Sequence, residues 1–251
     1  MPPLHFSQLK AIARSPLHYK HGLSVPLRDT KSLRMGRAVD AILFGTCGVV
    51  DYKGQRRGKE WEAFAQANAG SICLNATEAA QVRGMAKALE QHSDAMYLLS
   101  GTRQRTIRWK IAGRECEGTP DSFRPAELAD LKTCESAQPA RFPWKARQYG
   151  WTAQVCWYRE GLEQAGLAAP SVLCLVAVES KPPHPVTVFE LTERAIDEGT
   201  RTWRLWFERL RACEESNEWP AYAASRVPFD AADSESSSLS LVIDGEETEI
   251  D

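Results

Sequence analysis

The sequence predicts an α/β (α+β) fold in which a central mixed β-sheet is flanked by helices. Three observations carry this prediction. Long segments with apolar residues at helical spacing, such as 77–99 and 193–213, stand on both sides of shorter segments with strand character. Between residues 103 and 133 the apolar period changes to two, as in a hairpin followed by a third strand. The run 171–178 is nearly all apolar, which is typical of a buried strand.

The composition is that of an ordinary globular protein, but the charge is unevenly distributed. Of the 251 residues 43% are hydrophobic and 25% charged, which allows one sizeable core. The formal net charge is -2, yet the segment 230–251 holds eight acidic residues and no Lys or Arg, so the rest of the chain is net positive by about 6. The overall balance therefore neither indicates nor excludes a nucleic-acid partner.

Cysteine usage and hydropathy bear on the compartment. The seven cysteines are scattered without a C-x-x-C pair, which indicates reduced thiols and gives no zinc or iron–sulfur spacing. No run of eighteen apolar residues and no apolar leader segment is present. We therefore expect a soluble, cytoplasmic protein without a membrane partner.

The first predicted helix covers residues 8–14, and Pro16 ends it. Arg14, Ser15 and Lys20 lie around this break and are residue types suited to gripping a phosphate. A solvated amphipathic helix explains the same residues, and spacing alone favours that simpler explanation.

The second predicted helix covers residues 32–44, with Gly45 just past its end. Asp40 is the only acid in a strongly apolar neighbourhood of this helix, and Gly36, on the same face, would allow another backbone to approach closely. A buried carboxylate is unfavourable without a cation or donors, so Asp40 is either a ligand or a residue at the helix margin that reaches water.

The following segments alternate between loops, helices and strands. Residues 51–70 read as a polar loop ending in a short helix, and 77–99 as one long helix capped by Thr77 or Asn75. A hairpin follows, with strands at 103–110 and 114–117, and the third strand is 128–133.

Arg103 and Arg105 on this hairpin suit a nucleic-acid backbone. As charged residues that protect an edge strand they would be equally ordinary.

The second half of the chain contributes a long helix at 145–164, strands at 171–178 and 186–191, and a last helix at 193–213. On the first of these helices Gln154 and Tyr158 are one turn apart and could contact a nucleotide. An aromatic core helix is the alternative explanation.

The stretch from Asp121 to Lys132 carries the strongest chemical signal. Asp130 and Lys132 are two residues apart on a predicted strand and therefore point to the same face, where Asp121 could meet them from the preceding strand. Two carboxylates and an ammonium can hold Mg²⁺ and polarise an attacking water. A D-x-K tripeptide alone is common by chance, and its weight comes from the preceding G-x-x-D, from Asp40 and from the later Q-x-x-x-Y.

With these motifs the chain resembles the PD-(D/E)XK nucleases, specifically the branch of RecE (exodeoxyribonuclease VIII) and lambda exonuclease. The resemblance covers most of residues 4–222 and implies a restriction-endonuclease-like core. The residues that carry it are Ser7, Ser15-Pro16 and Tyr19, the run 36–43, Gly118-x-x-Asp121, Asp130-Leu131-Lys132-Thr133, Gln154-x-x-x-Tyr158 and Trp219-Pro220-x-Tyr222.

The resemblance implies a role for each matching residue. Asp121 and Asp130 would be metal carboxylates, the Leu131 carbonyl a further ligand, and Lys132 the group that orients and helps deprotonate the attacking water. Gln154 and Tyr158 match the helix motif beside the site and join the catalytic set. The implied cofactor is Mg²⁺, with Mn²⁺ as a substitute.

The implied activity is hydrolysis of DNA phosphodiester bonds, as 5′-to-3′ resection of duplex ends in recombination, leaving 3′ single strands for a single-strand annealing protein. Relatives form rings, so the resemblance also implies a homo-oligomer. Arg14, Ser15 and Lys20 become candidates for a clamp on the terminal phosphate.

Two positions depart from the family pattern. Asp40 stands where the RecE branch usually has His, and its oxygens remain compatible with Mg²⁺ or Mn²⁺. Gln104 stands where relatives tend to have Glu and brings no charge. These departures motivate two alternatives, a catalytically weakened DNA-binding or assembly protein and an endonuclease of the same fold.

The expected organisation is one nuclease domain, 1–222, followed by an acidic tail, 223–251. The tail is either flexible or forms a short hairpin around Asp244-Gly245.

Overall fold

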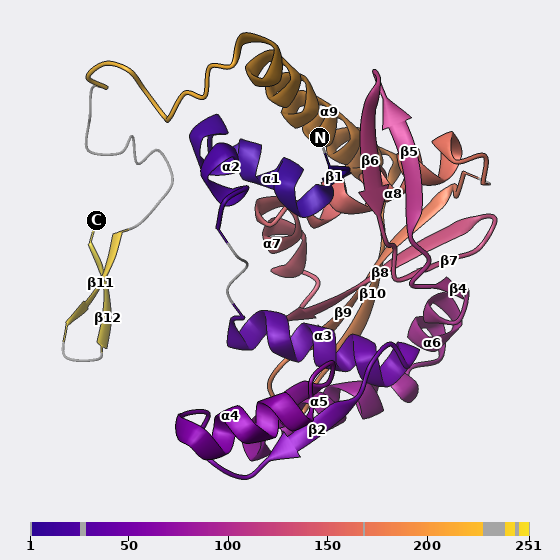
Figure 1. Ribbon diagram of the computed structural model, residues 1–251, viewed down its shortest axis with the longest axis vertical. Helices are drawn as coiled ribbons and strands as arrows, with labels where there is room; N and C mark the ends of the chain where they lie inside the picture. The colour runs from indigo at the N-terminus through magenta and orange to yellow at the C-terminus, as the bar shows by residue number, and fades with distance from the viewer. Residues whose placement is uncertain (1, 26–28, 168, 228–238, 244–245, 251) are drawn as a thin grey trace.

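The computed structural model describes residues 2–25, 29–167, 169–227, 239–243 and 246–250. At its centre lies a five-stranded mixed sheet with the strand order β10-β9-β8-β7-β4 (Figure 1). The central strands β8 and β9 are parallel, and all other neighbours in this sheet are antiparallel. The strands are β4 (Thr102–Arg103), β7 (Ser122–Phe123), β8 (Glu127–Cys134), β9 (Val172–Glu179) and β10 (Val186–Glu190). This architecture confirms the predicted fold class.

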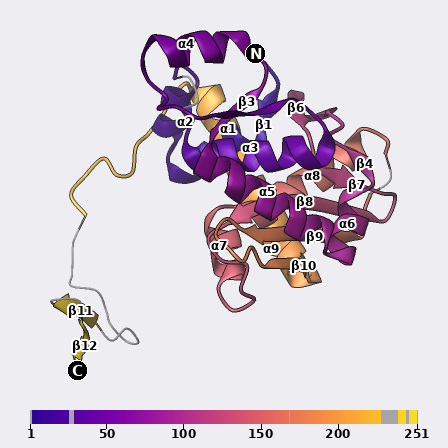
Figure 2. The same ribbon diagram turned by 90° about the horizontal axis from the view of Figure 1, so that it is seen from below.

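Helices cover both faces of the central sheet. They are α1 (Phe6–Arg14), α2 (Pro16–Gly22), α3 (Lys31–Phe44), α4 (Gly58–Ala67), α5 (Ala76–Glu90), α6 (Ser93–Leu99), α7 (Phe142–Gln148), α8 (Trp151–Gln164) and α9 (Glu193–Ser216). Because side chains alternate along a strand, β8 contributes Leu128 to the core under α1, α8 and α9, and Ala129 and Leu131 to the core under α3, α5 and α6. Both views place α4 at the end of the molecule opposite α9 (Figures 1 and 2).

A second sheet contains the predicted hairpin. Its strands are β1 (Leu4–His5), β6 (Arg114–Gly118) and β5 (Ile107–Ile111), in that order. Ala112 and Gly113 form the turn, both with positive φ, as the twist of a tight two-residue hairpin requires. The hairpin begins at Ile107, because Arg103 belongs to β4 and pairs with β7 of the central sheet.

Two long helices predicted from the sequence are each broken. The segment 77–99 divides into α5 and α6, because His92 starts the second helix by accepting the Ala95 N–H on its Nδ1 at 3.3 Å. The segment 145–164 divides into α7 and α8 at Gly150, whose φ of 69° lies in the left-handed region.

The predicted polar loop at 51–70 is flanked by two strands that the sequence analysis missed. The strands are β2 (Val49–Tyr52) and β3 (Ile72–Asn75), which pair in parallel. With α4 between them, they form a small lobe, residues 46–75, that we call the β2–β3 lobe. Tyr52, Trp61 and Phe64 pack together in it, with the Tyr52 ring centroid 5.2 Å from that of Trp61 and 4.8 Å from that of Phe64.

The end of the predicted nuclease domain returns to its beginning. The Leu17 N–H donates to the Pro220 carbonyl at 3.1 Å, and the Trp219 ring stacks on Tyr19 with centroids 5.6 Å apart. Beyond it, β11 (Leu239–Ile243) and β12 (Glu246–Ile250) pair as antiparallel strands. The predicted turn at 244–245 lies outside the described residues. Among the described helices, none combines the length and the apolar character needed to cross a membrane.

Candidate active site

The site is built where β7 ends beside β8. The two residues of β7 pair with Leu128 and Ala129, so the register places Asp121 opposite Asp130, just beyond the last pair. Here the Leu131 N–H donates to the Asp121 carboxylate (Oδ2) at 2.7 Å. Because the N–H and C=O of one strand residue face the same neighbour, the Leu131 carbonyl also points to this side. We call this stretch the open edge of β8.

Asp130 and Lys132 lie on one face of β8, as their spacing predicts. The Asp130 side chain is 4% exposed and that of Lys132 14% exposed. Lys132 Nζ forms an ion pair with Asp130 Oδ2, but this contact lacks hydrogen-bond geometry. The carboxylate is thus buried and accepts no hydrogen bond at Oδ2 from the described residues.

Gln154 and Tyr158 reach the site from α8. Lys132 Nζ donates to Gln154 Oε1 at 2.9 Å, and Gln154 Nε2 donates to the Tyr158 hydroxyl at 2.9 Å. The Trp151 ring, whose centroid is 5.9 Å from Lys132 Nζ, adds an aromatic face. Burial and the negative charge of Asp130 raise the pKa of Tyr158, so its hydroxyl stays protonated at neutral pH. The structure thus joins the predicted Q-x-x-x-Y pair to Lys132.

Asp40 approaches from α3 on the other side of the sheet. This helix packs closely on β8, because a Cβ at Gly36 would lie only 3.3 Å from Thr133 Oγ1. One turn further along, Asp40 is largely buried. Burial raises the pKa of Asp40 to about 7, the charge of Asp130 adds to this effect, and Lys132 partly offsets it. Asp40 therefore belongs to the same electrostatic site as Asp130.

Asp121 is held by donors on both carboxylate oxygens. Gln104 Nε2 donates to Oδ1 at 2.8 Å, while the Leu131 N–H occupies Oδ2. The Gln104 backbone has φ 48, in the left-handed region, and its N–H donates to the Asp121 carbonyl at 3.1 Å. Burial, followed by the charges of Asp130 and Asp40, raises the pKa of Asp121 well above its ordinary value. Gln104 is thus a neutral hydrogen-bond donor to Asp121.

The carboxylate and carbonyl oxygens of this site are chemically suited to binding a divalent cation. The charge of Asp130 raises the pKa values of Asp40 and Asp121, and Asp130 Oδ2 lacks a hydrogen bond from the described residues. Carboxylate and carbonyl oxygens are the ligands that Mg²⁺ prefers. The described ranges hold no group of three His, Cys, Asp or Glu side chains already arranged around a metal position. The oxygens that would bind a cation are contacted by other groups here: Lys132 pairs with Asp130, and two N–H groups donate to Asp121.

The residues predicted to bind phosphate have different surroundings. Ser15 is fully buried, and its hydroxyl accepts the His18 N–H at 3.2 Å, so the structure gives it the role of capping α2. Arg14 Nε donates to the Tyr222 hydroxyl at 3.0 Å, and Lys20 Nζ lies 4.8 Å from the centroid of the Trp219 ring. Both cations therefore contact residues 219–222, which we call the returning segment.

Arg103 and Arg105 are exposed on either side of Gln104, which places them beside the site.

One cation near the site was missed by the sequence analysis. Burial lowers the pKa of Lys10 on α1, and the charge of Lys132 lowers it further, so the two ammonium groups are neighbours. Lys10 lies one helical turn before Arg14, which is the signal that could have pointed to it. The site therefore contains two lysines opposite three carboxylates.

The arrangement of β7, β8, α3 and α8 around Asp121 and Asp130-x-Lys132 defines a class, the PD-(D/E)XK nuclease superfamily. The sequence agrees: residues 5–226 match the family described as a PDDEXK-like domain of unknown function (DUF3799), and the chain belongs to that family. The match thereby confirms the assignment to the PD-(D/E)XK nuclease superfamily that the sequence motifs predicted.

Solved structures support the fold. A candidate exonuclease from Eubacterium rectale superposes with a TM-score of 0.66 at 15% identity, covering 92% of this chain and 90% of that one. A phage-related exonuclease from Haemophilus somnus 129PT gives a TM-score of 0.38 at 12% identity, covering 86% and 97%. The fold assignment rests on the first of these. A comparison with curated proteins gave no match.

Proposed function

We propose that the protein is a Mg²⁺-dependent DNA exonuclease that hydrolyses phosphodiester bonds at duplex ends in the 5′-to-3′ direction. The observation that carries this proposal is the meeting of Asp121, Asp130 and Lys132 at the open edge of β8, with the Lys132 ammonium connected to Gln154 at 2.9 Å. Membership of the PDDEXK-like family supports the nuclease class.

The ligands for Mg²⁺, or for Mn²⁺ in its place, would be the carboxylates of Asp40, Asp121 and Asp130 and the carbonyl of Leu131. A cation held by these residues would supply positive charge for the scissile phosphate and Lewis acidity for the attacking water. A cation also favours the ionised form of Asp40, whose pKa of about 7 otherwise leaves it partly protonated at neutral pH.

Lys132 orients the attacking water. An ammonium has three N–H donors, of which one reaches Gln154 and one side faces Asp130, so a donor remains for a water or a phosphate oxygen. Gln154 fixes the ammonium through its Oε1 and is itself fixed by Tyr158. Because Tyr158 stays protonated, its hydroxyl proton remains available to a second acceptor, such as a phosphate oxygen.

The DNA backbone would lie along the cations around the site. Arg103 and Arg105 are exposed beside Gln104, and Lys10 lies close to Lys132. Arg14 and Lys20 would contribute at the far end of α1 and on α2, where each has an aromatic neighbour from the returning segment. Fixed cations beside a carboxylate cluster are suited to a phosphate chain.

The finer parts of the proposal rest on the resemblance to the RecE and lambda exonuclease branch. They are the 5′-to-3′ polarity, a role in recombination with a single-strand annealing partner and a homo-oligomeric assembly. A place in the cytoplasm is proposed from the scattered cysteines. A second candidate function is a nuclease-fold protein that binds DNA without cutting it. It is favoured by Gln104, which supplies an amide donor to Asp121 at 2.8 Å where a fourth carboxylate would strengthen cation binding.

A nuclease assay tests the proposal. Linear and covalently closed duplex DNA are incubated with the protein in Mg²⁺, in Mn²⁺ and in EDTA, with 5′-phosphate and 5′-hydroxyl ends compared on the linear form. We expect loss of the linear form only, in either metal and not in EDTA, with nucleotides released from the 5′ end. Nicking of closed circles indicates an endonuclease. Binding without any cleavage favours the second candidate.

A further inference from the structure

A cavity of about 810 Å³ opens from the active site toward the β2–β3 lobe. Asp40 and Gln104 of the active site line it, together with Trp61 of α4. Arg34 and Arg37 on α3 and Arg56 in the lobe also line it. The cavity is therefore continuous with the carboxylate site and rich in guanidinium groups.

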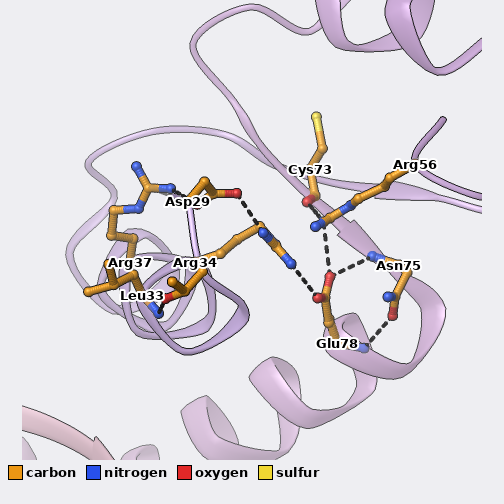
Figure 3. A network of polar contacts seen from close by, with 9 residues as sticks. Asp29, Leu33, Arg34, Arg37, Arg56, Cys73, Asn75 and Glu78 are labelled. Carbon is orange, nitrogen blue, oxygen red and sulfur yellow. Dashed lines mark hydrogen bonds and ion pairs between the residues drawn. The ribbon is translucent and has the colours of Figure 1, made fainter. Parts of the chain in front are cut away.

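A buried carboxylate fixes two of these arginines (Figure 3). Glu78, whose side chain is 3% exposed, lies 2.7 Å from Arg34 Nη2 and 2.9 Å from Arg56 Nη2, one at each oxygen. Glu78 also accepts the Asn75 N–H at 3.1 Å at the start of α5. Burial alone would raise the pKa of Glu78, but the bonds from Arg34 and the Asn75 N–H outweigh it and lower the pKa. The two guanidiniums are thus held by an ionised carboxylate.

The arginines keep unused hydrogen-bond donors. Asp29 accepts from Arg34 Nη1 at 2.5 Å and from Arg37 Nη2 at 2.6 Å, so two carboxylates face three guanidiniums. Each guanidinium has five N–H donors. Nε of Arg34 and Nε of Arg56 are buried and have no partner among the described residues, whereas 61% of the Arg37 side chain is exposed. The unused donors of these arginines suit an anion.

Trp61 supplies an aromatic wall in the same cavity. The Arg56 guanidinium carbon lies 5.5 Å from the Trp61 ring centroid, and Tyr52 and Phe64 support the ring from inside the lobe. Successive bases of a single strand stack on such rings, whatever their sequence. Arginines for a phosphate and a supported indole for a base together match one nucleotide.

We infer that this cavity binds a nucleotide of single-stranded DNA next to the scissile phosphate, with a phosphate at Arg34 and Arg37 and its base against Trp61. The inference rests on the proposed function, since the strand would enter past Asp40 and Gln104. A purely structural role for the arginines, as a clasp between α3 and the β2–β3 lobe, is the competing explanation. The clasp involves Glu78, Arg34 and Arg56, whereas Arg37 lies outside it.

Arg37→Gln separates the two explanations, with Arg83→Gln as its matched control. Both arginines pair with an aspartate through Nη2, at 2.6 Å for Arg37 and 2.7 Å for Arg83, and their side chains are 61% and 60% exposed. Only Arg37 lines the cavity. Both variants remove one charge and one surface ion pair, so their folding stability should change equally little.

Binding is measured by fluorescence anisotropy of a labelled eight-nucleotide dT strand, in EDTA so that nothing is cut. We expect R37Q to bind about fivefold more weakly and to lower the slope of log K against log salt by about 0.7, the value for one phosphate contact on a single strand. R83Q should change neither quantity. Equal behaviour of the two variants, or no binding by the wild type, would overturn the inference.

Trp61→Leu tests the base contact, using 2-aminopurine in the same strand as a stacking probe. We expect loss of the quenching on binding and about tenfold weaker affinity, whereas Trp61→Phe, which keeps a ring, should retain most of both. Equal quenching by wild type and W61L, with both folded by circular dichroism, would contradict a base at this wall. Binding by the wild type without cleavage of any DNA refutes the proposed exonuclease and leaves the nucleotide site standing.

Discussion

Asp40→Asn should stabilise the metal-free protein at neutral and alkaline pH. The carboxyl of Asp40 is largely buried beside Asp130, and its pKa is about 7 in the folded protein, compared with an ordinary value of 3.8. Folding therefore opposes its ionisation. An acid with a raised folded pKa causes no penalty below its ordinary pKa, a growing penalty as the pH rises above it, and the full penalty above the folded pKa.

The size of the effect follows from the pKa difference. At 1.36 kcal/mol per pH unit, the difference between a pKa of 3.8 and one of about 7 sets an upper limit of about 4 kcal/mol. Asn loses the attraction of Lys132 and keeps a polar group in a partly buried place, which reduces the gain. We expect D40N to raise the free energy of unfolding by about 1–2 kcal/mol at pH 8 and to have no stabilising effect at pH 4.

Urea unfolding at pH 4, 6 and 8 in EDTA measures this difference. Asp51→Asn is the control, because Asp51 forms an ion pair with Arg83 at the surface and should change stability by less than about 0.5 kcal/mol. Adding Mg²⁺ should stabilise the wild type more than D40N, since the cation favours the ionised carboxylate. A lower stability of D40N at pH 8, or a difference that does not depend on pH, would refute the reasoning.

Three further substitutions probe the packing and charges around the site. Gly118→Ala should destabilise the fold by about 1–3 kcal/mol, measured by urea unfolding, because the new Cβ would lie 2.8 Å from Cε1 of the buried Tyr158 ring. Gln104→Glu should raise the affinity for Mg²⁺ in calorimetry and lower stability in EDTA, because a donor to Asp121 becomes a fourth carboxylate. Glu78→Gln should cost about 3 kcal/mol at pH 7, and the difference from wild type should shrink as the pH falls below 4.5, the ordinary pKa of Glu78, because the wild-type carboxylate is then protonated.

A specific result would contradict each of these three predictions. A Cβ at Gly22 meets nothing within 4 Å, so G22A is the control for G118A, and equal stability of the two variants would contradict the close contact. Unchanged Mg²⁺ affinity in Q104E would place residue 104 outside the reach of a cation. A pH-independent loss in E78Q would show that lost packing, and not the ionised carboxylate, explains its effect.

Much of the site was predictable because its signals are local. Asp130 and Lys132 share a face through the period of a strand, and Gln154 and Tyr158 share one through the period of a helix. Asp40 stood out as a lone acid among apolar residues, and the structure gives it a raised pKa. The resemblance then joined segments that periodicity alone could not place together.

Other features depended on contacts distant in sequence. The predicted helix 145–164 is broken at Gly150, and Arg147 on the α7 side of the break pairs with Glu198 of α9 at 2.7 Å. No local pattern showed that Ser15 would be fully buried. Its hydroxyl caps α2 by accepting the His18 N–H and is therefore already used inside the fold.

The β2–β3 lobe was missed for a similar reason. Its strands are four residues long and only partly buried, so their alternation is too short to distinguish from a loop. Glu78 was predicted only as a residue in the first turn of a helix, yet it holds arginines that are 44 and 22 positions away in sequence. Such partners become visible only when the chain is folded.

The most direct test of the central claim is single-turnover cleavage of an end-labelled linear duplex in Mg²⁺ by wild type, Lys132→Ala and Lys181→Ala. Lys181 is an exposed lysine beyond β9 and serves as the control. We expect K132A to remain folded and to lose at least about a hundredfold in rate, while K181A cleaves like the wild type. A K132A protein that cuts DNA at the wild-type rate would contradict the assignment of the catalytic centre to the open edge of β8.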